Sequence, residues 1–226
     1  RHEQVVKVNN PKNTSIREMF QGLLTVLRSQ RVLQAIVAVT LVANFFAFPF
    51  HQMVPVISRD VLSADALHFG ILAAAWGVGA LAGSLVLTTR PTRRPGWTFA
   101  AGMTTLFICV CGFALSRNYL LSLGFLLTGG IGFAGFASMQ IFITLSTASP
   151  TFHGRSLGVV GLAIGMQPLG AISLGLLAER TGPRIALASF TLVGLCALLI
   201  VRWRYPELGR RAVFRESTAL KASPPH

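Results

Sequence analysis

The stretch from Ala66 to Thr89, ALHFGILAAAWGVGALAGSLVLTT, decides the fold class of this chain. It runs for 24 residues without Asp, Glu, Lys or Arg. A helix that crosses the hydrocarbon layer of a bilayer, about 30 Å thick, needs about 20 predominantly apolar residues. The stretch is therefore predicted to be a transmembrane helix.

Five other segments of similar length also lack charged residues, and the whole chain follows the same trend. Of its 226 residues 52% are hydrophobic and 12% are charged, whereas soluble domains have about 25% charged residues. We therefore expect an all-α integral membrane protein with six transmembrane helices. The further spans are Val32–Phe50, Trp97–Leu115, Tyr119–Thr144, Ser156–Ala178 and Ile185–Val201.

The basic residues indicate how the chain is oriented. Twenty Lys and Arg against seven Asp and Glu give a net charge of +13. A single-strand nucleic-acid groove would mix basic residues with exposed aromatic ones, but here they avoid the spans, so we expect no nucleic-acid partner. Six spans put both termini on one side, and 16 of the 20 basic residues fall on that side. The positive-inside rule predicts a multi-pass membrane protein with both termini cytoplasmic.

Three regions follow from this pattern. Residues 1–31 are predicted to form a cytosolic connector with an amphipathic helix, because Ser15 to Glu18 reads as a capping box before apolar residues at helical spacing. Residues 32–203 form the six-helix bundle. Residues 204–226 form a basic cytosolic tail.

The second and fifth spans are weakly similar to each other. A shift of 88 residues lays Phe69–Gly83 on Leu157–Ala171, so that Gly70 falls on Gly158 and Gly77 on Gly165. This pattern favours two inverted triplets of helices, a 3+3 arrangement common in transporters. The alternative is that small residues recur in any packed membrane helix.

Glycine and proline suggest where helices approach closely or bend. Helices in lipid associate through small residues four apart. Proline removes a backbone donor and bends a helix, so bends are expected at Pro49 in the first span and Pro168 in the fifth. Both fit a protein that rocks between states, but they also fit a static bundle. The candidates for packing and hinge residues are Gly79, Gly83, Gly161, Gly165, Pro168 and Gly170.

A few polar or amphipathic side chains enter the spans and are candidates to line a substrate cavity. They are Asn44, Trp76, Gln140, Thr144 and Gln167. Thr40, Asn44 and His51 share one helix face, as do Gln140 and Thr144. The alternative is that they form hydrogen bonds between helices, each worth about 0.6 kcal/mol.

The sequence does not favour an enzyme. A membrane serine protease of the rhomboid kind needs Gly-x-Ser-Gly in one helix and a His in a later one, and that string does not occur. Cys109 and Cys111 point away from each other on a helix, and the histidines stand far apart in the sequence. We expect no catalytic residue, no metal site and no cofactor.

Several segments, in order, resemble the C-terminal half of a major facilitator superfamily transporter. They are MVPVISRDVL (Met53–Leu62), GILAAAWGVGALAGSLVL, and ASPTFHGRSLGVVGLAIGMQPLGAISLGLLAERTGP (Ala148–Pro183). The resembling branch includes the enterobactin exporter, macrolide-efflux proteins and transmembrane secretion effectors, and the likeness covers roughly Ile16 to Trp203. Gly154, Arg155 and Gly158 match the family's cytosolic turn Pro-x-x-x-Arg-Gly-Arg-x-x-Gly, although His153 replaces its first arginine and Pro150 is one residue too close.

The resemblance implies a twelve-helix transporter of the cell membrane, a bacterial inner membrane, with its substrate site between two six-helix halves. It implies secondary active, proton-coupled efflux of small amphipathic compounds such as drugs or siderophores. The partner would be an N-terminal six-helix half of the same or another chain, or a second copy, and that half would hold the coupling group because these spans carry no charge. The alternative is a non-transporting six-span remnant or an accessory membrane subunit.

Overall fold

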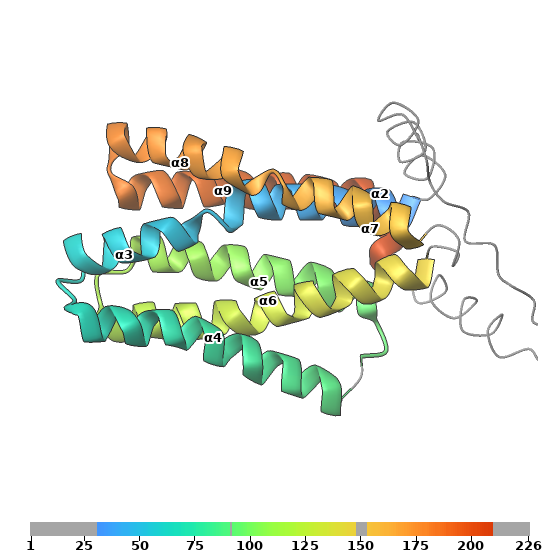
Figure 1. Cartoon of the computed structure of the whole chain (residues 1–226), viewed down its shortest axis with the longest axis horizontal. Helices are drawn as coiled ribbons and strands as arrows, with labels where there is room; N and C mark the ends of the chain where they lie inside the picture. Colours follow the sequence, from blue (N-terminus) through green and yellow to red (C-terminus); the bar gives the residue numbers. More distant parts are fainter. Residues whose placement is uncertain (1–30, 91, 148–152, 210–226) are drawn as a thin grey trace, which may run out of the picture.

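The computed structural model describes residues 31–90, 92–147 and 153–209, and these are almost entirely helical (Figure 1). The predicted amphipathic helix of the connector and most of the basic tail lie outside the described residues. The elements are α2 (Arg31–Val42), the π-helix η1 (Ala43–Ala47), α3 (Phe50–Asp60), α4 (Ala66–Thr89), α5 (Pro95–Leu115), α6 (Tyr119–Thr147), α7 (His153–Ile164), α8 (Gln167–Thr181), α9 (Pro183–Arg204) and the 3₁₀ helix η3 (Pro206–Gly209).

Six helical runs in the described part are long and apolar enough to cross a membrane. Four are the single helices α4, α5, α6 and α9, while α2–η1–α3 and α7–α8 each form one interrupted span. The all-α, six-span prediction is confirmed, and the chain is a multi-pass membrane protein. The first span reaches Asp60 rather than Phe50, because the helix resumes after Pro49 and the charged pair Arg59–Asp60 lies at its end.

The spans run side by side, and alternate helices begin at opposite ends of the bundle (Figure 1). At one end α2 begins, α4 ends, α5 begins and α9 ends. We call this the basic end and the other the far end. The prediction that the basic end faces the cytosol rests on its charges. The arginines of the basic end in the described part include Arg31, Arg90, Arg93, Arg94, Arg202 and Arg204.

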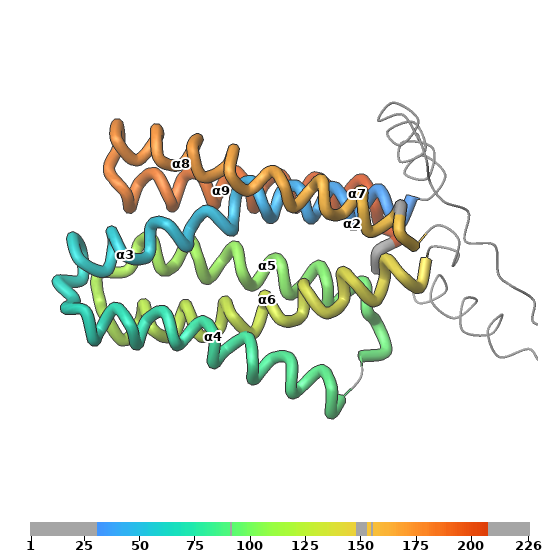
Figure 2. Tube along the Cα trace, in the orientation of Figure 1, coloured from blue at the N-terminus to red at the C-terminus, as the bar shows by residue number. Residues whose placement is uncertain are grey.

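The helix contacts have the pattern that two inverted triplets would give. α4, the second span, packs against α6, the first helix of the other triplet; in the same way α7 packs against α2, and α8 against η1. α5 lies along α6, and α9 lies along α2 and η1, as the tube view shows (Figure 2). The bundle is thus arranged as half of a major facilitator fold.

Proline sets both helix interruptions. Pro49 has no N–H to donate to the carbonyl of Phe45, and the preceding turn is a π-helix in which Phe48 N donates to Ala43 O over 3.0 Å. Pro168 likewise cannot donate to the carbonyl of Ile164, and α7 ends at that residue. The bends expected from the two prolines are therefore present as breaks.

Glycine brings three helix pairs into backbone contact. A Cβ atom added to Gly79 would lie 2.0 Å from the carbonyl oxygen of Leu127 in α6. One added to Gly102 in α5 would lie 2.5 Å from the carbonyl oxygen of Gly132 in α6, and one added to Gly170 in α8 would lie 2.1 Å from that of Phe45 in η1. No side chain fits at these positions, so the helices approach as closely as backbone allows.

Candidate functional site

Four polar side chains are buried where the first helices of the two triplets meet, and we call them the Thr40 cluster: Thr40, Asn44, Gln140 and Thr144. Within α2 and η1, Thr40 Oγ1 donates to Ile36 O at 2.8 Å and Asn44 Nδ2 donates to Thr40 O at 2.9 Å. Within α6, Thr144 Oγ1 donates to Gln140 O at 2.7 Å. The spacing of four residues places each donor one turn beyond its acceptor.

One hydrogen bond of the cluster joins the two helices. Gln140 Nε2 donates to Thr40 Oγ1 across 100 residues of sequence. Thr40 was not among the predicted site residues, although it shares a helix face with Asn44. The missing information was the partner, because the sequence does not show which helix lies opposite that face.

Trp76 lies in an aromatic group formed by α3, α4 and α6. Its ring centroid is 5.0 Å from that of Phe50, 5.1 Å from that of His51 and 5.5 Å from that of Phe133. Phe133 precedes Gln140 by seven residues, so Trp76 contacts α6 about 10 Å farther toward the far end than the Thr40 cluster. The structure thus separates Trp76 from three of the other predicted cavity residues.

Gln167 stands apart from the cluster as well. It is the first residue of α8, directly after the break, and is half-buried. Within the described residues its side chain has no hydrogen-bond partner. Gly170, one turn later, meets Phe45 of η1, so this end of α8 rests on the segment that carries Asn44.

The remaining glycines of the predicted hinge and loop motif lie on an open face. A Cβ atom at Gly154 or Gly161 of α7 would meet nothing within 4 Å, and one at Gly165, in the break after α7, would lie 3.2 Å from the carbonyl oxygen of Leu162. Gly158 is exposed, and the side chain of Arg155 lies outside the description. Gly70 and Gly77 of α4, the repeat-related glycines, are equally open.

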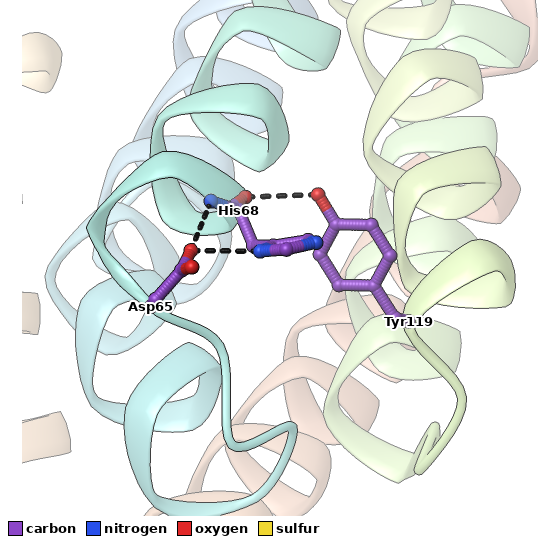
Figure 3. A network of polar contacts seen from close by, with 3 residues as sticks. All are labelled: Asp65, His68 and Tyr119. Atoms are coloured by element: carbon purple, nitrogen blue, oxygen red, sulfur yellow. Dashed lines mark hydrogen bonds and ion pairs between the residues drawn. The ribbon is translucent and has the colours of Figure 1, made fainter.

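A polar network at the far end fixes where α4 begins (Figure 3). Asp65 Oδ1 accepts a hydrogen bond from His68 N at 2.8 Å and lies 2.7 Å from His68 Nδ1. Tyr119 Oη of α6 donates to His68 O at 2.9 Å. The backbone hydrogen bond from His68, followed by the bond to its ring, lowers the pKa of Asp65. The network caps one helix and ties it to the next.

The described residues offer hydrogen bonding and apolar contact rather than reactive chemistry. Among them, no three His, Cys, Asp or Glu side chains gather closely enough to hold a metal ion. Cys109, Cys111 and Cys196 are free thiols. Such an arrangement can hold a ligand or a neighbouring helix.

A six-span bundle of two inverted triplets, joined by a buried polar contact, defines the chain as half of a major facilitator transporter. Comparison with known sequences agrees with this assignment. Residues 2–220 match the family described as transmembrane secretion effector, and the chain belongs to that family of the major facilitator superfamily. It is a family of transporters, not of enzymes.

The chain is also similar to curated efflux proteins. Macrolide efflux protein A of Streptococcus pyogenes is 24% identical over 171 residues, which cover 74% of this chain and 42% of that protein. The protein of the same name from a serotype M6 strain of this species matches to the same extent. The chain thus spans about two-fifths of the length of these relatives. No solved structure matches the chain.

Proposed function

We propose that this chain is the C-terminal half of a secondary active efflux transporter. The observation that carries the proposal is the hydrogen bond from Gln140 to Thr40, which places a buried polar contact between the first helices of the two triplets. In transporters built from repeats, substrate sites lie near the bilayer midplane at such an interface. Membership in the family and similarity to macrolide efflux proteins support export as the direction of transport.

The character of the buried groups suggests the class of substrate. The Thr40 cluster supplies neutral amides and hydroxyls, and Trp76 with its neighbours Phe50 and Phe133 supplies aromatic surface. Neutral donors and acceptors, with aromatic rings about two turns farther along α6, fit a small amphipathic compound, such as a drug or a siderophore, better than an ion.

The coupling is proposed to be proton antiport, with the coupling group outside this half. The acidic residues that the description includes lie at the ends of spans or beyond them: Asp60, Asp65, Glu179 and Glu207. A carboxylate that takes up and releases a proton at membrane depth would face the bundle interior. The partner half is therefore expected to supply it.

The partner is proposed to be an N-terminal six-helix half, of the same or another chain, or a second copy. The faces of α4 and α7 that carry Gly77 and Gly161 are uncovered within the described residues. Both helices are the second of their triplet, so one partner placed across the pair would meet small residues on each. Close backbone approach is the usual way in which membrane helices associate.

The proposal is tested by measuring accumulation of a radiolabelled macrolide in cells that carry the chain in its natural context. Replacing both Gln140 and Gln167 by Leu should raise accumulation, because both candidate amides are lost, while the amount of folded protein is unchanged. Gln52→Leu, at an exposed position of α3, is the matched control. Abolishing the proton gradient with an uncoupler should raise accumulation to the same level.

The alternative is a six-span remnant or accessory subunit that does not transport. It predicts equal accumulation with and without the chain and no effect of the double variant. The size of the native polypeptide decides what to assay: an antibody to the tail should detect either this chain of 24.2 kDa or a product near twice that mass. The larger product would carry both halves.

A further inference from the structure

A groove lies between α4 and α5, with α6 as its floor, and we call it the α4–α5 groove. None of the four residues of the Thr40 cluster lines it. Its volume is about 400 Å³, within the range of about 300–1,000 Å³ that small-molecule sites occupy. The walls are apolar apart from threonine side chains. The lining includes Val86 and Leu87 of α4, Trp97, Thr98 and Thr105 of α5, and Ile131 of α6.

Small residues create the space. Gly102 and Gly132 bring α5 and α6 into backbone contact, and Gly132 and Gly135 leave the floor of the groove open beside Ile131. α4 meets α6 closely at Gly79 and Gly83 and then diverges from it toward the basic end (Figure 1). The α4 wall of the groove, from Ala82 to Leu87, belongs to this diverging part of the helix.

The groove has the depth of one membrane leaflet. Its lining on α5 runs from Trp97 to Thr105, and these eight steps along the helix rise about 12 Å. One leaflet contributes about 15 Å of hydrocarbon. Trp97 is 52% exposed at the mouth, the depth at which tryptophan commonly sits at the membrane–water interface.

Three arginines lie in sequence between the two walls of the groove: Arg90 follows α4, and Arg93 and Arg94 precede α5. Arg90 directly follows α4, where its N–H donates to the groove residue Val86 at 2.8 Å. Thr92 Oγ1 lies 2.9 Å from Oγ1 of the groove residue Thr98, and Arg94 N donates to Thr92 Oγ1 at 3.2 Å. Thr92 and Arg94 are thus fastened to the groove wall at Thr98.

These arginines are available to an anion. Arg90, Arg93 and Arg94 are all exposed, and within the described residues none of them forms an ion pair with a carboxylate. The N-terminus of α5, at Pro95, directly follows Arg94, and the positive end of its dipole favours negative charge as well. Basic clusters next to transmembrane helices on the cytoplasmic side recognise anionic lipid headgroups.

We propose that the α4–α5 groove binds one anionic phospholipid of the leaflet at the basic end. An acyl chain would lie between α4 and α5, and the phosphate would meet Arg90, Arg93 and Arg94. The proposal does not depend on transport or on the identity of the partner half. It assigns a role to Arg90, Arg93 and Arg94, which take no part in the proposed substrate site.

Native mass spectrometry of the detergent-purified full chain tests this with phosphatidylglycerol and phosphatidylcholine of identical acyl chains. Each arginine near a membrane surface contributes about a five-fold preference for anionic lipid. We expect one phosphatidylglycerol to bind more than ten-fold more tightly than phosphatidylcholine. The triple variant Arg90→Gln, Arg93→Gln, Arg94→Gln should bind both lipids alike, and Ala101→Phe, which fills the groove, should weaken both.

The matched control removes the same charge at the far end, with Arg59→Gln, Arg117→Gln and Arg180→Gln. This variant should keep the preference. Equal binding of the two lipids by the natural chain would overturn the proposal, and so would a preference that survives in the basic-loop variant or disappears in the far-end control. A stable dimer that retains no lipid would also overturn it, since a second copy would then cover the groove.

Discussion

α4 and the α7–α8 span occupy equivalent places in the two triplets, yet the sequence builds them differently. α4 is one uninterrupted helix of 24 residues, held against α6 by Gly79 and Gly83. α7–α8 is broken after Ile164, and its close contact is made by Gly170 with η1. A shared position in the repeat therefore fixes which helix a span packs against, but not how it makes the contact.

The position of proline explains the difference. The residue of α4 that corresponds to Pro168 in the 88-residue repeat is Ala80, which keeps its backbone donor. Gly77 and Gly165 are also equivalent, but α4 continues through Gly77 while the other span turns at Gly165. Glycine alone thus leaves a membrane helix intact, and proline three residues later breaks it.

The largest expected effect comes from Gly79→Ala in α4. The added methyl group would lie 2.0 Å from the Leu127 carbonyl oxygen, and overpacking of this kind costs about 1–3 kcal/mol. We expect the free energy of unfolding, measured by titration with sodium dodecyl sulfate and circular dichroism, to fall by about 2 kcal/mol. Gly77→Ala, which meets nothing within 4 Å, is the control; an equal loss there would show that α4 is not held by close packing.

Pro168→Ala should make α7–α8 more like α4. It restores a donor for the Ile164 carbonyl, and one backbone hydrogen bond contributes about 1 kcal/mol. Amide exchange around Gly165 and Met166, followed by mass spectrometry, should slow about five-fold. Ala80→Pro makes the reciprocal change and should speed exchange in α4. Unchanged rates in both variants would mean that packing, not proline, sets the break.

A smaller effect is expected for the contact between α2 and α6, the helices against which α7 and α4 pack. A double-mutant cycle of Thr40→Val and Gln140→Leu should give a coupling energy of about 0.6 kcal/mol, typical of polar pairs in membranes. Ser84→Ala paired with Gln140→Leu is a control, because Ser84 bonds only within α4 at Ala80. A coupling of zero in the first cycle would remove the Thr40 cluster as a link between triplets.

The smallest effect concerns the helix caps, since Asp65 caps α4 whereas Met166 gives α8 no side-chain cap. The native pKa of Asp65 lies below its ordinary value of 3.8. Its stabilisation is therefore complete well above pH 3.8 and is lost as the pH falls through the lower native value. The melting temperature of Asp65→Asn should be slightly below that of the natural chain at pH 7, and the difference should shrink as the pH falls below 3.8. A constant difference would show that the charge is not the cause.

The sequence predicted the spans well because burial in lipid demands long uncharged segments whatever the neighbouring helices are. It also located both proline breaks, since the lost donor is a local property. The predicted cavity residues were harder to place. Asn44, Gln140 and Thr144 come together around Thr40. Trp76 of α4 contacts α6 at Phe133, about two turns from Gln140, and Gln167 has no part in the cluster. Helical spacing gives the face of a residue but not the helix opposite.

The sequence by itself determined the membrane class, the six spans and the side on which positive charge accumulates. These depend on composition and on the length of each segment, which act before any helix meets another. Only the tertiary structure decided that Thr40 meets Gln140, that Gly79 and Gly170 are the close contacts while Gly161 lies open, and that a groove lies beside the basic loop. Such pairings depend on how the helices pack in three dimensions, and residues 100 apart carry no local signal of it.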